Sequence, residues 1–205
     1  MQSRRERRKE QTRAALLHAA ITLFAERGIY GTRVEDITER VDLGKGAFYN
    51  YFPSKDALIA VLVAEGVRTF EEEYLSRLNG TDVVAARVVD LARLHADFLD
   101  QHPQYGLLFH QARGLLLLKE TQVERLREVF ADYLRSVGHA LIPNGRHAWS
   151  DEDLLELAAA FVGEVSGYRS FRIAAALAPK ESIAAEVLAL GIPGLIEHWE
   201  SSRPR

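Results

Sequence analysis

Apolar residues recur at intervals of three and four along almost the whole chain, which is the spacing of one face of an α-helix. In the first such stretch the apolar residues are Ala15, Leu16, Ala19, Ala20, Leu23 and Phe24. Gly28 follows as a natural helix-ending residue, so the pattern predicts a first helix from about Thr12 to Arg27. Strand-like alternation never extends beyond about four residues. The sequence therefore predicts an all-α fold.

Turn and capping residues divide the rest of the pattern into further helices. Thr32 followed by Glu35 has the form of a capping box and predicts that a short helix begins there. Asp42, Leu43 and Gly44 interrupt that helix after two turns. Further helices are expected over residues 45–51, 54–78, 82–101, 103–113, 121–141, 151–176 and 182–199. The expected architecture is about nine helices, with the short ones near the N-terminus.

Composition narrows the class of protein. The 205 residues are 47% hydrophobic and 27% charged, as in an ordinary folded protein, and they include no cysteine. A disulfide framework, a cysteine-based zinc finger and a thiol nucleophile are thereby excluded. The charge-free stretch 187–196 is about half the length that spans a bilayer, and the charged N-terminus has no apolar signal region. We expect a soluble cytoplasmic protein with no membrane partner.

The net charge of −3 hides an asymmetry between the two ends of the chain. Residues 1–55 contain 11 Lys and Arg against seven Asp and Glu, whereas residues 56–205 contain 15 against 22. The first 13 residues alone hold six basic and two acidic side chains. A basic end on an acidic body indicates that this end meets a polyanion. We expect Arg4, Arg5 and Arg8 to lie in an arm before the first helix and to contact DNA, the alternative being a solvated tail.

Two short predicted helices joined by a three-residue turn, after a longer supporting helix, match the helix-turn-helix arrangement. Phe48 and Phe52, four residues apart, should face the core with Ile37, Val41 and Leu43. The residues left to contact DNA are Thr32, Arg33, Gly44, Lys45, Gly46, Ala47, Tyr49, Asn50, Tyr51 and Lys55. Lys45, Ala47 and Asn50 are expected nearest the base edges, and Tyr49, Tyr51 and Lys55 near phosphates. The alternative is a small helical hairpin with chance aromatic residues.

These residues carry a family resemblance. Residues 32–37 (TRVEDI), followed by residues 46–58 (GAFYNYFPSKDAL), resemble the N-terminal domain of tetracycline-repressor (TetR) family regulators. The preceding residues 19–28 and 30–32 are also similar to that family's first helix and its exit. Asp42 stands where a turn glycine is usual, and Gly44 stands where a serine usually caps the second short helix. Both are compatible with the fold, but Gly44 lacks a hydroxyl that could bind phosphate.

The resemblance implies a homodimeric transcriptional regulator, usually a repressor, that a small molecule releases from a palindromic operator. It implies a DNA-binding domain over residues 1–55 and a helical effector-binding and dimerisation domain over residues 56–205. The last two predicted helices would form the dimer interface, through Ala159, Val162, Gly163, Leu188, Ile192, Leu195 and Trp199. Small residues there permit close helix approach, although the same helices could pack only within one chain.

The resemblance also implies an effector pocket among the central helices. The residues expected to line it are His95, Phe98, Tyr105, Phe109, His110, Arg113, Phe130, Tyr133, Phe161 and Tyr168. Their aromatic character favours an apolar or aromatic effector, whereas the alternative is that they form only a core. No carboxylate spacing completes a metal site with His95 and His102, so we expect neither metal nor cofactor.

Other function classes find little support in the sequence. There is no phosphate-binding glycine loop, no nucleophile elbow and no His-Glu-x-x-His motif, so we expect no enzyme. A helical dimer that binds nucleic acid without sequence preference is the main alternative, and an all-helical small-molecule enzyme is the weakest. A salt-dependent comparison of operator and random DNA would separate these classes, because only a specific reader holds one duplex much more tightly.

Overall fold

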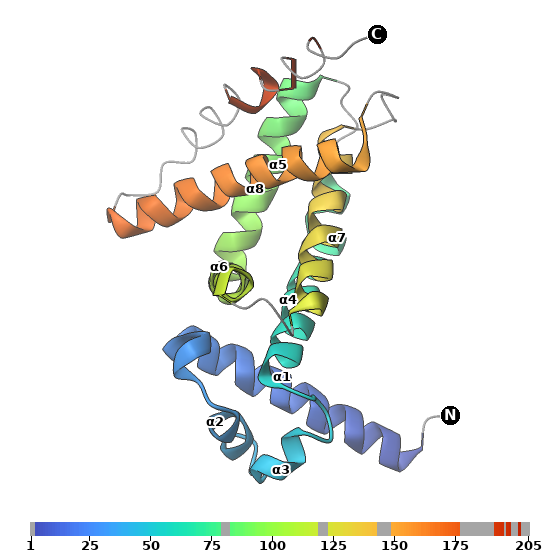
Figure 1. Ribbon diagram of the computed structural model, residues 1–205, viewed down its shortest axis with the longest axis vertical. Coiled ribbons are helices and arrows are strands. Elements are labelled where there is room, and N and C mark those ends of the chain that lie inside the picture. The colour runs from blue at the N-terminus through green and yellow to red at the C-terminus, as the bar shows by residue number, and fades with distance from the viewer. Residues whose placement is uncertain are drawn as a thin grey trace. The chain divides into compact units, whose positions relative to one another are not determined.

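The computed structural model describes residues 3–78, 83–118, 123–142, 149–176, 191–194, 196–197 and 201. Within these residues the chain is helical and contains no strand, which confirms the all-α prediction (Figure 1). The elements are α1 (Arg4–Gly31), α2 (Val34–Glu39), α3 (Lys45–Phe48), α4 (Lys55–Glu73), a 3-10 helix (Leu75–Arg77), α5 (Val84–Gln101), α6 (Pro103–Leu118), α7 (Glu124–Leu141) and α8 (Asp151–Ala174). No helix in this described part is long and apolar enough to cross a membrane.

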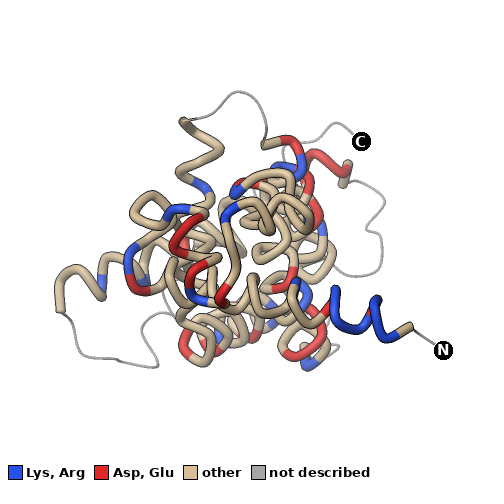
Figure 2. The backbone as a smooth tube through the Cα atoms, turned by 90° about the horizontal axis from the view of Figure 1, so that it is seen from below, with Lys and Arg blue, Asp and Glu red and all other residues tan. Residues whose placement is uncertain are grey.

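The first helix begins earlier than its apolar pattern predicts. Ser3 caps α1: its hydroxyl accepts from the Glu6 N–H at 3.2 Å, and the Glu6 carboxylate accepts from the Ser3 N–H at 2.7 Å. Arg, Lys, Glu and Gln have high helix propensity, so the charged stretch extends the helix without an apolar face. The expectation that Arg4, Arg5 and Arg8 lie in an arm before the first helix is therefore wrong. Figure 2 shows the first turns of α1 almost entirely in blue, as a basic helical extension.

A glycine interrupts α1 one residue after its predicted end. Gly28 has φ 77° and ψ 164°, a conformation that side-chain-bearing residues rarely adopt. The break leaves the Ile29 N–H outside the helical ladder, and it donates to Gln111 Oε1 of α6 at 2.6 Å. Thr32 then turns back, and its hydroxyl donates to the Gly28 carbonyl at 2.9 Å.

The cap of α2 lies one residue later than predicted. Arg33 is the N-cap, and its N–H donates to the Asp36 carboxylate at 2.7 Å. Thr32 is only 1% exposed because its hydroxyl is used against α1. The predicted capping box of Thr32 and Glu35 is therefore wrong by one position.

Packing groups the chain into two compact units. The first unit comprises residues 1–67 and 102–129, and the second comprises residues 68–101 and 130–205. In the first unit α6 packs along α1, and α4 approaches α6 so closely that a Cβ on Gly66 would lie 2.8 Å from the Tyr105 ring. The predicted domain boundary at residue 55 divides the chain by function and does not coincide with the boundaries of these units. It stays a prediction.

Each unit has its own core. Ile37, Phe48 and Phe52 are buried in the first unit, as the spacing predicts, with the two phenylalanine rings 5.6 Å apart. In the second unit Ser150 and Asp153 form a capping box at the start of α8. A Cβ on Gly138 of α7 would lie 2.7 Å from the Leu154 carbonyl oxygen, so α7 and α8 cross at close range.

Candidate nucleic-acid interface

The turn between α2 and α3 accommodates the two unusual residues noted in the sequence. Asp42 has φ 55°, a left-handed conformation that aspartate tolerates better than most residues. The Leu43 N–H then donates to the Thr38 carbonyl at 2.9 Å. Gly44 is extended, with φ −73°, and caps α3, since its carbonyl accepts from the Ala47 N–H at 2.9 Å. The two short helices are thus joined as a helix-turn-helix.

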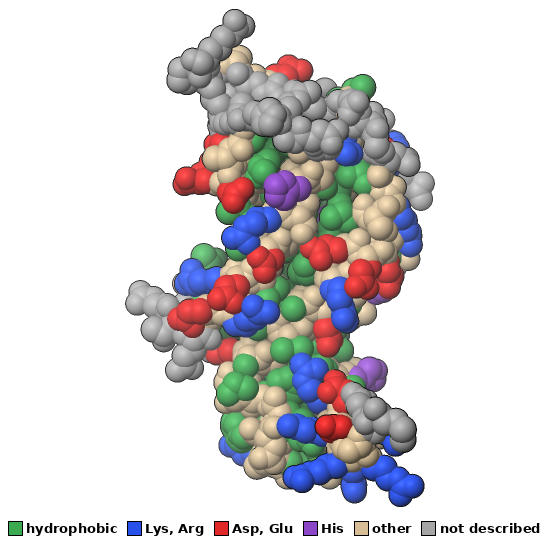
Figure 3. All heavy atoms as spheres, turned by 90° about the vertical axis from the view of Figure 1, so that its right-hand side faces the viewer, with side chains coloured by type: hydrophobic (Ala, Val, Ile, Leu, Met, Phe, Trp, Pro, Cys, Tyr) green, Lys and Arg blue, Asp and Glu red, His purple; other side chains and the backbone are tan. Residues whose placement is uncertain are grey.

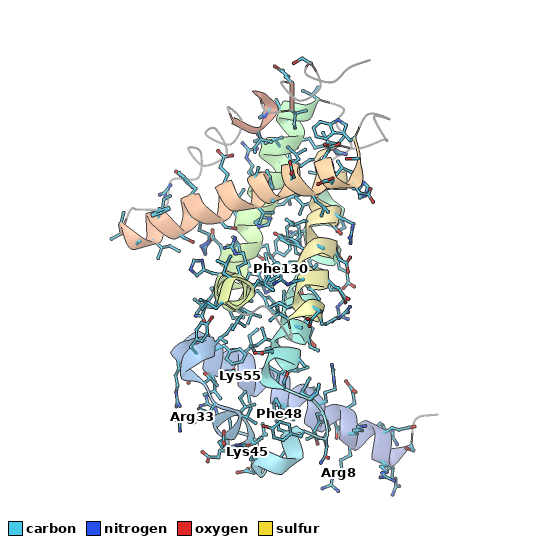
Figure 4. All side chains as sticks on the ribbon, in the orientation of Figure 1. Arg8, Arg33, Lys45, Phe48, Lys55 and Phe130 are labelled. Atoms are coloured by element: carbon cyan, nitrogen blue, oxygen red, sulfur yellow. The ribbon has the colours of Figure 1, made fainter. Side chains whose placement is uncertain are left out.

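One side of α3 is anchored and the other is open. Phe48 is fully buried and points inward in Figure 4, whereas Lys45 on the same helix points outward. A Cβ added at Gly44 or Gly46 would meet no atom within 4 Å. The exposed or partly exposed predicted contacts on this side are Gly44, Lys45, Gly46, Ala47, Tyr49, Asn50 and Tyr51. No atom of the described chain blocks this surface, so the exposed side of α3 can be inserted into a nucleic-acid groove.

Lys45 is paired with an acid of the neighbouring helix. Its Nζ lies 2.5 Å from Glu35 Oε1, and the side chains are 56% and 43% exposed. The hydrogen bond from Lys45 holds the pKa of Glu35 below its usual range, and the same bond raises the pKa of Lys45. Lys45 therefore stays charged, with an anion already beside it.

Further basic side chains surround this surface. Arg33, at the start of α2, is exposed, and so are Arg4, Arg5 and Arg8 on the extension of α1. Arg8, Arg33 and Lys45 are seen along the lower edge of the first unit in Figure 4. In Figure 3, blue side chains gather at the same lower end. The excess of basic residues near the N-terminus of the sequence therefore lies exposed on the surface formed by α1, α2 and α3.

Two residues predicted to contact DNA have internal roles instead. The Lys55 ammonium donates to the carbonyls of Ile29 and Thr32, at 2.8 and 2.9 Å. Thr32 itself is buried. Sequence spacing gives no sign of these bonds, because they depend on how α1 ends after Gly28. The expectation that Thr32 and Lys55 present their side chains to DNA is contradicted by this geometry.

Four of the predicted effector-binding residues come together in the second unit. His95, Phe98, Tyr133 and Phe161 are each at most 2% exposed, and the Tyr133 hydroxyl lies 2.9 Å from His95 Nε2. Phe70 packs against His95, Phe98 and Tyr133, with its ring centroid 4.9 Å from that of His95 and 5.4 Å from that of Phe98, and the Phe161 ring lies 6.2 Å from that of His95. Sequence reasoning missed Phe70 and Tyr74, although their i, i+4 spacing on a predicted helix was a usable signal.

The other predicted effector-binding residues are placed differently. Tyr105, Phe109, His110 and Arg113 lie on α6 in the first unit, and His110 is exposed. Phe130 of α7 is partly exposed (Figure 4). The Tyr168 hydroxyl accepts from Arg172 at 3.1 Å. The predicted set is therefore divided between the two units. No group of three His, Asp or Glu side chains within the described ranges could hold a metal ion.

Comparison with known proteins identifies the first unit's helix-turn-helix. Residues 16–62 match the sequence profile of the family described as bacterial regulatory proteins, tetR family. This segment is a TetR-family helix-turn-helix domain. The predicted family and the predicted DNA-binding transcriptional regulator are thereby confirmed.

Proteins similar to this chain are themselves described as transcriptional regulators. The HTH-type transcriptional regulator HbdR of Aromatoleum sp. (strain CIB) is 25% identical over 159 residues, 69% of each chain. The uncharacterized HTH-type transcriptional regulator YdgC of Bacillus subtilis (strain 168) is 27% identical over 191 residues, 91% of this chain and 93% of the relative. The transcriptional regulator FadR from Bacillus subtilis, solved in complex with stearoyl-CoA, has the same fold: TM-score 0.67 at 15% identity, over 87% of this chain and 98% of that one.

The residues predicted to form the dimer interface differ in exposure. Ala159 and Gly163 are exposed on α8, and a Cβ on Gly163 would meet nothing within 4 Å. Val162 and Ile192 are buried within the single chain, at 8% and 2% exposure. Leu188, Leu195 and Trp199 lie outside the described residues. Of the four described residues, Ala159 and Gly163 are thus available to a second copy.

Proposed function

We propose that the protein is a homodimeric repressor that reads a palindromic operator through α3 and is released by a small apolar or aromatic molecule. The observation that carries the DNA-reading part is the asymmetry of α3. Phe48 fixes the helix to the core, while the space outside Gly44 and Gly46 is empty. A helix held in this way can enter a major groove without disturbing its own packing.

Specific reading is assigned to the residues of the open side. Lys45, Ala47 and Asn50 are the proposed base-edge contacts, because lysine can bond to guanine O6 and N7, asparagine to adenine, and alanine can touch the thymine methyl group. Arg33, Tyr49 and Tyr51 are the proposed phosphate contacts. Gly44 and Gly46 let the backbone approach the groove closely, since a side chain there would occupy the open space.

The basic extension of α1 is assigned to sequence-independent binding. Arg4, Arg5 and Arg8 are held on a capped helix, and all three are exposed. Contacts from such residues to phosphates position a protein on the duplex but carry no sequence information. They also make the affinity depend on salt, because each neutralised phosphate releases a counterion.

The effector-binding and dimerisation functions are assigned to residues 56–205. The stearoyl-CoA complex of the FadR relative supports an effector with a large apolar part. The aromatic residues around Phe70 supply apolar side chains in the second unit, with the His95–Tyr133 bond as their polar element. Ala159 and Gly163 of α8 are the proposed contacts with the second copy, together with Leu188, Leu195 and Trp199, whereas Val162 and Ile192 are buried within the single chain.

The test of the DNA-reading proposal is selection of duplexes from a random pool by the wild-type protein and by Gly46→Leu. Wild type should enrich a palindrome whose half-sites are about one helical turn apart. Gly46→Leu should lose the enrichment, because leucine fills the space that the groove would occupy, while its circular dichroism and thermal unfolding remain those of wild type.

The outcomes separate the proposed function from its alternatives. Equal binding of all duplexes by wild type would indicate a non-specific nucleic-acid-binding dimer, and no complex at all would favour another class of protein. If Gly46→Leu selects the wild-type sequence, α3 does not read the groove in the proposed way.

A further inference from the structure

Most basic side chains near the helix-turn-helix already have acidic partners. Lys45 pairs with Glu35 at 2.5 Å, Arg40 pairs with Glu26 at 3.2 Å, and Arg27 lies 4.0 Å from Asp36. Within the described stretch from residue 26 to residue 45, Arg33 is the basic residue for which no acidic group lies within this distance. Within this stretch, three of the four basic side chains therefore have an acidic neighbour before DNA arrives, and Lys45 is the one that is also a proposed base contact.

The Glu35–Lys45 pair has a special position among these contacts. Lys45 is the first residue of α3, and Glu35 lies in the first turn of α2, so the ion pair joins the two helices of the helix-turn-helix. Both side chains remain about half exposed. An exposed pair of this kind is weak enough for an arriving ligand to replace one partner.

An unpaired lysine at this position would bind any phosphate and would therefore strengthen binding to every sequence. Such sequence-independent attraction supplies most of the affinity of regulators for random DNA. A carboxylate that already holds the ammonium removes much of this gain, because the lysine must leave Glu35 before it can pair with a phosphate. Guanine offers two acceptors in the groove, so pairing with it compensates better for the loss of the Lys45–Glu35 ion pair than a phosphate contact does.

We propose that Glu35 is a specificity-determining residue, which restrains Lys45 from phosphates and so weakens binding to random DNA more than binding to the operator. The proposal rests on the proposed function, namely that α3 reads the operator. It is a form of discrimination in which wrong partners are penalised rather than the right partner favoured.

The chain offers a matched control for the test. Glu39 lies on the same helix and is exposed, and no ion pair to it within 4.0 Å is seen in the described part of the chain. Glu35→Gln and Glu39→Gln thus remove the same charge from α2, but only the first releases Lys45. Dissociation constants are measured for the selected operator and for a random duplex of equal length, over a series of salt concentrations.

Glu35→Gln should tighten binding to the random duplex by about two- to fivefold per protomer, the range that corresponds to losing one exposed ion pair. It should also steepen the salt dependence by about 0.9 per protomer, which corresponds to one new phosphate contact. Affinity for the operator should change less, so the ratio of the two affinities should fall. Glu39→Gln should change the dissociation constants for both duplexes by the same, smaller factor.

A second background isolates the role of Lys45. In the Lys45→Gln background, Glu35→Gln should change the affinities for the two duplexes no more than Glu39→Gln does, because there is no ammonium left to release. If Glu35→Gln and Glu39→Gln behave alike in the wild-type background, or if the effect of Glu35→Gln persists without Lys45, Glu35 acts only through net charge and the proposal is overturned. A failure of the proposed function itself would look different, since wild type would then prefer no duplex.

Discussion

Lys55 closes the junction between α1 and α4 with two charge-assisted hydrogen bonds. The carbonyls of Ile29 and Thr32 lie beyond the Gly28 break, where the helical ladder no longer supplies donors. A single ammonium satisfies both carbonyls and thereby fixes the path of the chain into α2. The placement of the helix-turn-helix thus depends on a residue that does not belong to it.

Lys55→Met should destabilise the protein while keeping the length of the side chain. Two partly buried carbonyls would lose a charged donor, so the free energy of unfolding should fall by about 1.5–3 kcal/mol. Denaturant unfolding measures the change. Lys45→Met is the control, because its side chain is exposed and its loss should cost less than about 0.5 kcal/mol. Equal stability of the two variants would contradict the role given to Lys55.

The burial of apolar residues could be predicted from their helical spacing. The roles of polar side chains that hydrogen-bond to backbone carbonyls could not. Phe48, Phe52 and Ile37 are buried as expected, because a helix with one apolar side has few ways to bury it. Thr32 and Lys55 were assigned to DNA from their types, but their hydrogen bonds follow from the Gly28 break. A sequence pattern does not reveal which carbonyls such a break leaves open.

The helix α1 combines two parts that serve different purposes. Its later turns carry apolar residues into the core, whereas its first turns are charged and exposed. The pattern of apolar positions detects only the first kind, which is why the predicted helix began near Thr12. Ser3 and Glu6 were the available signal, since Ser-x-x-Glu has the form of a capping box. With that motif taken into account, the sequence indicates the whole of α1.

Replacing Arg4, Arg5 and Arg8 by glutamine should weaken binding to operator and random DNA alike. Glutamine preserves helix propensity, so the loss reports charge rather than folding. The salt dependence should become shallower by up to about 0.9 for each phosphate contact that is lost. Replacement of Arg93 on α5 and of Arg125 and Arg135 on α7 is the matched control, with the same change in net charge. If both triple variants bind as wild type does, the extension is only a solvated helix.

The assembled molecule is proposed to act as a dimer through α8. Gly163 is exposed and has open space around it, so the single chain has no packing reason to require glycine there. Close approach of a second helix would give such a reason, because small residues let two backbones come together. The same inference was available from sequence, although Val162 and Ile192 are in fact buried within the chain.

Gly163→Leu should leave the monomer folded but separate the dimer. Sedimentation should show a shift toward the monomer, with the thermal unfolding of the chain itself little changed. Affinity for a palindromic duplex should fall by on the order of 10²-fold or more, because two linked half-site contacts become independent. Gly163→Ala, which adds a single methyl group, serves as the control. A stable Gly163→Leu dimer would place the interface elsewhere.

The packing of α6 against α1 has a consequence for building chimeric regulators. The Ile29 amide bonds to Gln111, which lies 82 residues later in the chain, and α6 belongs to the same compact unit as the helix-turn-helix. A fragment cut after α4 would therefore expose the side of α1 that α6 covers and would leave the Ile29 amide without its acceptor. Transplanting the operator preference of this protein onto another scaffold calls for moving α6 together with α1–α4, or for grafting only the outward residues of α3.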